Sequence, residues 1–174
     1  RKQLLEWAEL SFDVIVSDTD ESFPGNLSFE ETAIYIARNK ALAVASINGS
    51  SIPVLAADTI VVCDNAIIGK PKNKEEAIEF LGRLSGNVHR VITGVVILVN
   101  DIEVAFADTT IVNFHSLSQE QIIFYVDKYK PYDKAGAYAI QEWIGVVGIK
   151  SIEGDFYNVM GLPVSRVLQE LSKL

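Results

Sequence analysis

Two long apolar segments, Val88–Val99 and Ile102–Phe114, follow each other with Asn100-Asp101 between them. Asn and Asp suit the backbone of a tight two-residue turn, so the two segments predict an antiparallel β-hairpin. The first segment is apolar almost throughout, which is typical of a central strand, whereas the second alternates and should have a wetter face. The chain must therefore fold around a sheet that contains this hairpin.

The rest of the chain predicts helices alternating with shorter strands. Capping boxes and amphipathic spacing indicate the helices, and short apolar runs indicate the strands. Because helices are mixed with hairpins, we expect an α/β fold on a mixed sheet rather than a pure βαβ array. The expected helices are residues 3–10, 28–46, 74–84, 118–129 and a terminal helix from Pro163, and the further strands are Asp13–Val16, 53–62 and Val146–Ile152.

Composition narrows the class of protein. A chain of 174 residues with 49% hydrophobic residues predicts one globular domain. Its net charge of −8 argues against a partner that is nucleic acid or a membrane surface, because both need a basic face. An apolar stretch of about 18 residues and a charged-then-apolar leader are both missing from the sequence. The single cysteine, Cys63, rules out an intrachain disulfide and suits a reducing compartment, so we expect a soluble, cytoplasmic protein.

One carboxylate interrupts an apolar run that otherwise predicts a buried strand. Asp58 lies within residues 55–62, and the turn Gly69-Lys70-Pro71 follows shortly after. A carboxylate in such a run is costly unless a cation compensates it, and a carboxylate with a nearby lysine is what metal-assisted phosphate chemistry requires. The alternative is a capping or turn aspartate beside a solvated lysine.

Other sequence patterns exclude several kinds of site. The chain has no Walker A motif, no Gly-x-Gly-x-x-Gly fingerprint, no zinc-spaced His/Cys cluster and no Gly-x-Ser-x-Gly elbow. An oxygen-ligand site for Mg²⁺ or Mn²⁺ with lysines as phosphate clamps remains. Further polar residues each allow a structural interpretation: a solvated turn at Asp20-Glu21, a surface lysine at Lys40, a hydrogen-bonded histidine at a strand end at His89, and loop caps at Asp155 and Asn158.

Several motifs resemble those of one known family over essentially the whole chain. The two longest lie near the C-terminal end and are highly specific. The motifs are Ala57-Asp58-Thr59, Gly69-Lys70-Pro71, Leu84-Ser85-Gly86 with His89 and Thr93-Gly94-Val95, Asp133-Lys134-Ala135-Gly136-Ala137-Tyr138-Ala139-Ile140-Gln141, and Ile152-Glu153-Gly154-Asp155-Phe156-Tyr157-Asn158-Val159-Met160-Gly161-Leu162-Pro163. They are similar to the signatures of the Maf family, nucleoside triphosphate pyrophosphatases historically called septum formation proteins.

The sequence departs from the family pattern at its start. The family opens with a strand and a Ser-x-Ser-Pro-Arg-Arg loop, whereas this sequence begins at Arg1-Lys2-Gln3, with Arg1 matching the second arginine. We therefore expect one Maf-like domain over residues 1–174 that lacks this strand and the first part of the loop.

The resemblance implies a long mixed sheet flanked by helices, with a cleft between two lobes, similar to the inosine triphosphate pyrophosphatases. It implies hydrolysis of a nucleoside triphosphate to the monophosphate and pyrophosphate, a divalent metal, and a homodimer. The segment ending at Gln141 resembles the branch that acts on dTTP and UTP. The alternative function is a nucleotide-binding regulator of cell division without important turnover.

The resemblance also assigns roles to individual residues. Asp58 would accept the proton of the attacking water or bind the metal, and these two roles remain open. Glu21 would be a second metal ligand. The residues implied to bind the substrate or select it are Arg1, Lys40, Thr59, Lys70 and Gln141.

Overall fold

The computed structural model describes residues 1–48 and 51–174 and divides into two compact units. Unit 1 comprises Arg1–Thr59, Ile92–Asp108 and Gly161–Leu174, and unit 2 comprises Ile60–Val91 and Thr109–Met160. The fold is α/β, as the sequence predicted, and its long strands contribute residues to both units.

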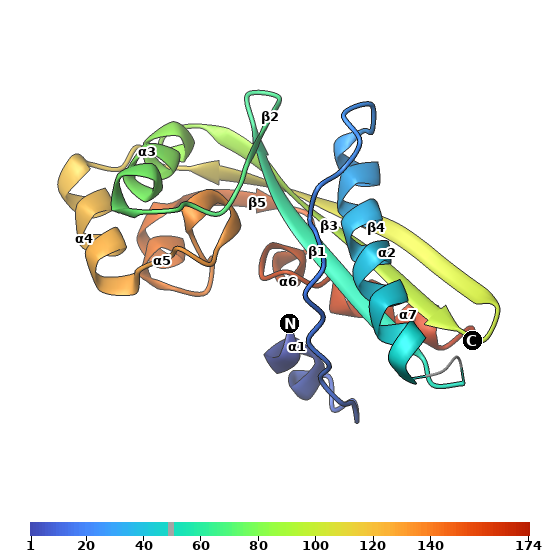
Figure 1. Ribbon diagram of the computed structural model, residues 1–174. Coiled ribbons are helices and arrows are strands. Elements are labelled where there is room, and N and C mark those ends of the chain that lie inside the picture. Colours follow the sequence, from blue (N-terminus) through green and yellow to red (C-terminus); the bar gives the residue numbers. More distant parts are fainter. Residues whose placement is uncertain (49–50) are drawn as a thin grey trace. The chain divides into compact units, whose positions relative to one another are not determined.

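A five-stranded sheet forms the centre of the fold, in the order β2-β1-β3-β4-β5 (Figure 1). β2 pairs antiparallel with β1, placing Ile68 opposite Val61, and β5 pairs antiparallel with β4, placing Ile152 opposite Val112. The predicted hairpin has the expected bounds. The strands are β1 (Val54–Cys63), β2 (Ala66–Ile68), β3 (Val88–Val99), β4 (Ile102–Phe114) and β5 (Ile149–Glu153).

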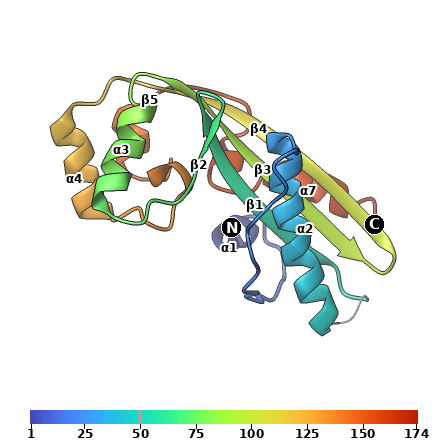
Figure 2. The same ribbon diagram turned by 45° about the horizontal axis from the view of Figure 1, so that its top comes forward.

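Unit 1 holds the helices α1 (Lys2–Trp7), α2 (Phe29–Asn48) and α7 (Val164–Leu171). The predicted capping box begins α2: the Ser28 hydroxyl accepts from Glu31 N–H, and the Glu31 carboxylate accepts from Ser28 N–H. In both views α2 lies along β1 and β3 (Figure 1 and Figure 2). Small and β-branched side chains fill this contact, namely Ala37, Ala41, Val54 and Val96.

Unit 2 has its own hydrophobic core and a second group of helices. α3 packs on α4 (Figure 2), and buried side chains such as Leu81, Phe114 and Tyr125 fill the space around them. The predicted caps are present, since Asn73 and Ser118 accept hydrogen bonds from the first turns of α3 and α4. The elements are α3 (Lys74–Leu84), α4 (Gln119–Tyr129), the 3₁₀ turn η1 (Ala135–Ala137), α5 (Trp143–Gly148) and α6 (Phe156–Val159).

Two strand predictions were wrong. Asp13–Val16 forms neither helix nor strand in the described part of the chain, and its apolar side chains stay in solvent, with Val16 89% exposed. The first residues of Val146–Ile152 belong to α5, and the strand begins at Ile149. A short apolar run does not separate helix from strand by periodicity, and here Gly145 lets the helical backbone approach the Ile140 carbonyl.

The described helices include none with the length and apolar character needed to cross a membrane.

His89 is the buried histidine of unit 2 and predicts a pH dependence of stability. Its Nε2 lies 2.8 Å from the Tyr138 hydroxyl, and Phe114 and Tyr138 pack edge-on against its ring. Burial lowers the pKa of His89 from 6.5 to about 4, because the imidazolium form loses its hydration. Folding therefore favours the neutral ring.

We expect the free energy of unfolding to be largest above pH 6.5 and to fall as the pH drops from there toward about 4. The unfolded chain binds the additional proton in this window, and the full loss from His89 is about 3 kcal/mol. Urea unfolding at pH 7 and pH 4.5 measures it. His89→Asn, which does not titrate, should lose part of this slope, and an equal slope in both proteins would contradict the assignment.

Candidate functional site

Lys40 lies between two carboxylates in unit 1. Its Nζ is 2.6 Å from Asp58 Oδ1 and 2.7 Å from Glu21 Oε1. Burial alone would lower the pKa of Lys40, but its hydrogen bonds with Asp58 and Glu21 outweigh burial and raise it. The ammonium is therefore held charged, and it supplies the partner that the buried carboxylate in β1 needed.

The backbone explains why the side chains of Lys40 and Asp58 meet. Successive side chains of a strand point to opposite faces. Asp58 of β1 lies on the face covered by α2, because it contacts Lys40 of that helix. Lys40 follows Ala33 by seven residues, which is two helical turns, so both lie on the same side of α2. A Cβ on Gly94 of β3 would lie 2.2 Å from the Ala33 carbonyl carbon. Glycine there lets α2 approach the sheet closely enough for Lys40 to reach Asp58.

Thr59 makes a different set of contacts. Its hydroxyl lies 2.9 Å from the Thr93 hydroxyl on β3 and accepts a hydrogen bond of 3.1 Å from Arg1 Nη2. Arg1 Nε also donates to the Gly161 carbonyl at 2.8 Å. Gly161 has φ +109°, a backbone conformation that favours glycine. Arg1 is thus oriented by two contacts from separate segments of unit 1.

A short loop presents Glu21. The Asp20 carboxylate accepts from Ser22 N–H at 2.9 Å and from the Ser22 hydroxyl at 2.6 Å. These bonds lower the pKa of Asp20 and close a tight turn around Glu21. The sequence allowed this segment to be either a solvated turn or part of the site. Asp20 is a turn residue, whereas Glu21 pairs with the site lysine, Lys40.

Asp58 and Glu21 could hold a divalent cation whose remaining ligands come from a phosphate group and water. Among the described residues, no group of three or more His, Cys, Asp or Glu side chains is placed to hold an ion by itself. Asp58 and Glu21 nevertheless converge on one positive charge, the Lys40 ammonium. Mg²⁺ is commonly held by one or two carboxylates, with phosphate oxygens and water completing its shell. The donor set therefore suits Mg²⁺ or Mn²⁺ brought together with a substrate.

Unit 2 contains the two remaining predicted residues, Lys70 and Gln141. The turn that carries Lys70 is tied to the long motif, because Gly136 N–H donates to the Gly69 carbonyl at 3.0 Å. The pKa of Asp133 is lowered, mainly by a hydrogen bond from Lys134 and to a smaller extent by the charge of Lys70. Gln141 lies exposed in a turn after the buried Ile140. Its amide is therefore accessible.

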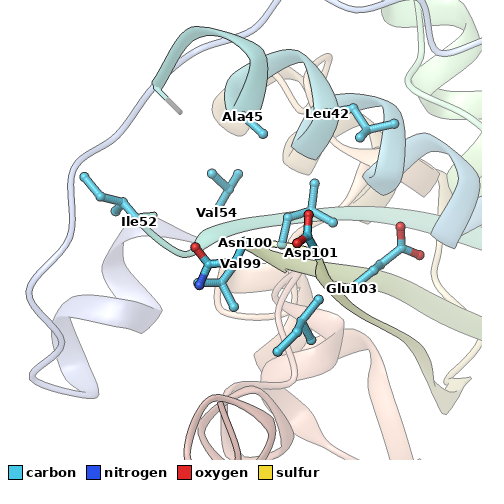
Figure 3. Close-up of a pocket in the computed structure, with 10 residues that line it drawn as sticks. Leu42, Ala45, Ile52, Val54, Val99, Asn100, Asp101 and Glu103 are labelled. Atoms are coloured by element: carbon cyan, nitrogen blue, oxygen red, sulfur yellow. The ribbon is translucent and has the colours of Figure 1, made fainter. Parts of the chain in front are cut away.

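Unit 1 also contains a cavity of about 290 Å³ whose lining differs from the group of Lys40, Asp58 and Glu21. Figure 3 shows Leu42, Ala45 and Val54 at its walls, with Asp101 and Glu103 from the β3–β4 hairpin. Its lining is mainly aliphatic, and the charged residues that line it, Asp101 and Glu103, are acidic, so the described residues of its lining offer no cation to a triphosphate. None of the predicted site residues lines it.

The structure places five of the seven predicted site residues in two contact groups of unit 1, Lys40 with Asp58 and Glu21, and Arg1 with Thr59, and the charges of Asp58 and Glu21 act on Arg1. The sequence did not identify Thr93 as a site residue, although Thr93 belongs to the motif Thr93-Gly94-Val95. Its signal was a hydroxyl within the apolar part of β3, and Thr93 is fully buried against Thr59.

Comparisons with known proteins agree with the motifs. A family profile described as Maf-like protein matches residues 1–174. The chain is 48% identical to the dTTP/UTP pyrophosphatase of Parabacteroides distasonis, covering 98% of this chain and 89% of that protein. It is 48% identical to the dTTP/UTP pyrophosphatase of Cytophaga hutchinsonii, covering 100% and 79%. It is 46% identical to the protein of the same name from Bacteroides thetaiotaomicron, covering 100% and 91%.

Proposed function

Because this chain belongs to the Maf family, we propose that it hydrolyses dTTP and UTP to the nucleoside monophosphate and pyrophosphate. The names of its relatives support this substrate class. The observation that carries the reaction type is the contact of Lys40 with both Asp58 and Glu21, which gathers carboxylates and cations in one place. Phosphoryl transfer needs this combination, because catalysis depends mainly on positioning and charge stabilisation.

Asp58 is the proposed proton acceptor for the water that attacks the α-phosphorus. Its side chain is 11% exposed, so a small part of it reaches solvent while the strand holds it in place. Lys40 and Arg1 are the proposed cations for the triphosphate in unit 1, and Lys70 is a further one. Cations that are already oriented stabilise the charge developing on the phosphate oxygens without further rearrangement.

Glu21 and Asp58 are the proposed residues for holding Mg²⁺ or Mn²⁺, which supplies charge neutralisation and lowers the pKa of water when bound. Lys40, which pairs with both carboxylates, would donate to a phosphate oxygen of the substrate. Family resemblance further supports a cytoplasmic homodimer, and light scattering of the purified protein tests the assembly.

Gln141 is the proposed residue that recognises the base, with Thr59 as a second selecting residue. A glutamine amide offers one acceptor and a donor group, which match N3–H and O4 of thymine and uracil. Cytosine presents the opposite pattern at these two atoms. A site built for one pattern rejects the other because its own polar atoms would lose their partners.

The test is pyrophosphate release from a nucleotide panel with Mg²⁺ or Mn²⁺. We expect kcat/KM for UTP to exceed that for CTP, and Gln141→Ala to reduce this ratio by about tenfold or more. Wild-type protein that binds nucleotides without releasing pyrophosphate would favour the regulator without turnover instead. A UTP preference that Gln141→Ala leaves unchanged would remove Gln141 from base recognition.

A further inference from the structure

Tyr125 is a buried polar side chain that the proposed reaction does not use. It lies in α4 and is fully buried, and its ring stacks on that of Tyr129 with centroids 4.9 Å apart. Its hydroxyl donates to the Glu142 carboxylate and accepts from Ala139 N–H at 3.2 Å. A buried hydroxyl needs such partners, and here both belong to one four-residue segment.

That segment is the turn that carries Gln141. Glu142 N–H donates to the Ala139 carbonyl at 3.1 Å, which closes a β-turn with Ile140 and Gln141 as its central residues. The Tyr125 hydroxyl therefore holds both ends of the turn, Ala139 through its backbone and Glu142 through its side chain. Ile140 points into the core, and Gln141 is left exposed between the two anchors.

Neighbouring contacts hold the turn against the helices. A Cβ on Gly145 would lie 1.7 Å from the Ile140 carbonyl oxygen, so α5 packs directly on the turn. Trp143 at the start of α5 meets Phe124 of α4 edge-on, with centroids 4.9 Å apart. Burial, with help from the Glu142 hydrogen bond, raises the pKa of the Tyr125 phenol. The hydroxyl therefore keeps its proton near neutral pH and remains a donor.

We propose that Tyr125 is a positioning residue for base selection, setting the orientation of Gln141 through the Ala139–Glu142 turn. This inference rests on the proposed function. It goes beyond that function because Tyr125 touches neither the base nor the phosphates. Two hydrogen bonds to one oxygen fix a turn more tightly than packing of its apolar residue does alone. Tight placement matters because recognition of a base edge needs accurate donor and acceptor positions.

The central experiment compares Tyr125→Phe with Tyr129→Phe. Both substitutions remove one hydroxyl from stacked rings of the same helix and keep the aromatic packing. We expect Tyr125→Phe to lower the UTP/CTP ratio of kcat/KM by about tenfold, mainly through a higher KM for UTP, and to leave kcat for UTP little changed. Tyr129→Phe should keep the wild-type ratio.

Substitutions at Glu142 test the same bond from its other end, and they also serve if Tyr125→Phe folds poorly. Glu142→Ala should reproduce the loss of discrimination, whereas Glu142→Gln keeps an oxygen acceptor and should restore most of it. Equal loss of activity toward UTP and CTP in Tyr125→Phe and Glu142→Ala would mean a merely structural role and overturn the proposal.

The outcomes separate this inference from the proposed function. A wild-type UTP preference that survives both Tyr125→Phe and Glu142→Ala contradicts the positioning role alone. Wild-type protein without pyrophosphate release or without a UTP preference contradicts the proposed function, and the positioning role falls with it.

Discussion

Asp58→Asn should lower kcat for pyrophosphate release from UTP by about 10³-fold while nucleotide binding survives. The amide keeps the size of the carboxylate and can still accept from Lys40, so the packing of β1 should persist. It is a far weaker base and a poorer metal ligand, so both roles left open for Asp58 predict the same loss. Steady-state pyrophosphate release measures kcat, and calorimetric titration with a non-hydrolysable α,β-methylene analogue of UTP measures binding.

Asp127→Asn is the matched control for this substitution. Asp127 also pairs with a lysine, Lys74, but this pair is exposed and lies on α3 and α4. An exposed ion pair contributes little, so the control should keep wild-type activity and stability. Turnover near the wild-type level in Asp58→Asn would make Asp58 a structural residue and refute the proposed mechanism.

Gly94→Ala should reduce the free energy of unfolding by about 4 kcal/mol, more than the usual cost of an added core methyl group. The new Cβ would lie 2.2–2.5 Å from backbone atoms of Ala33 and Ile34, and backbone cannot move aside as a side chain can. Relief requires α2 to shift away from β3. The melting temperature should fall by about 10 °C, measured by circular dichroism.

The same shift should impair activity. α2 carries Lys40, so its displacement lengthens the contacts with Asp58 and Glu21. Gly82→Ala is the control: nothing lies within 4 Å of its added Cβ, and alanine is the better helix former. It should keep activity and leave stability unchanged or slightly raised. A Gly94→Ala protein as stable and active as wild type would show that α2 does not depend on this close approach.

The sequence predicted those elements whose signals are local. Val88–Val99 and Ile102–Phe114 were predicted with their observed bounds, because a polar turn separates two long β-rich runs. Asn73 and Ser118 marked the helix starts by side-chain capping, which needs only the next few residues. Val146 was misplaced because a short apolar run suits helix or strand equally, and only tertiary contact decides between them.

In the candidate site too, the sequence predicted what has a local signal and not the contacts between distant segments. Asp58 was identifiable because a carboxylate in a buried strand demands a partner, but the sequence does not say that the partner is Lys40, 18 residues earlier. The Thr59–Thr93 contact and the hold of Tyr125 on the Gln141 turn also join distant segments. Their spacing follows no local rule, because strand order and helix packing create these contacts.

The single cysteine has a practical consequence for measuring how this chain opens. Cys63 is 1% exposed within the core of unit 2, and burial raises the pKa of its thiol. A thiol reagent therefore modifies it chiefly when that core opens, and the labelling rate reports the free energy of opening. Unit 1 contains no cysteine, although it carries Asp58 and Lys40. A nucleotide that binds the folded chain stabilises it and slows the labelling of Cys63, so the native thiol measures how far binding stabilises the core of unit 2 without an added probe.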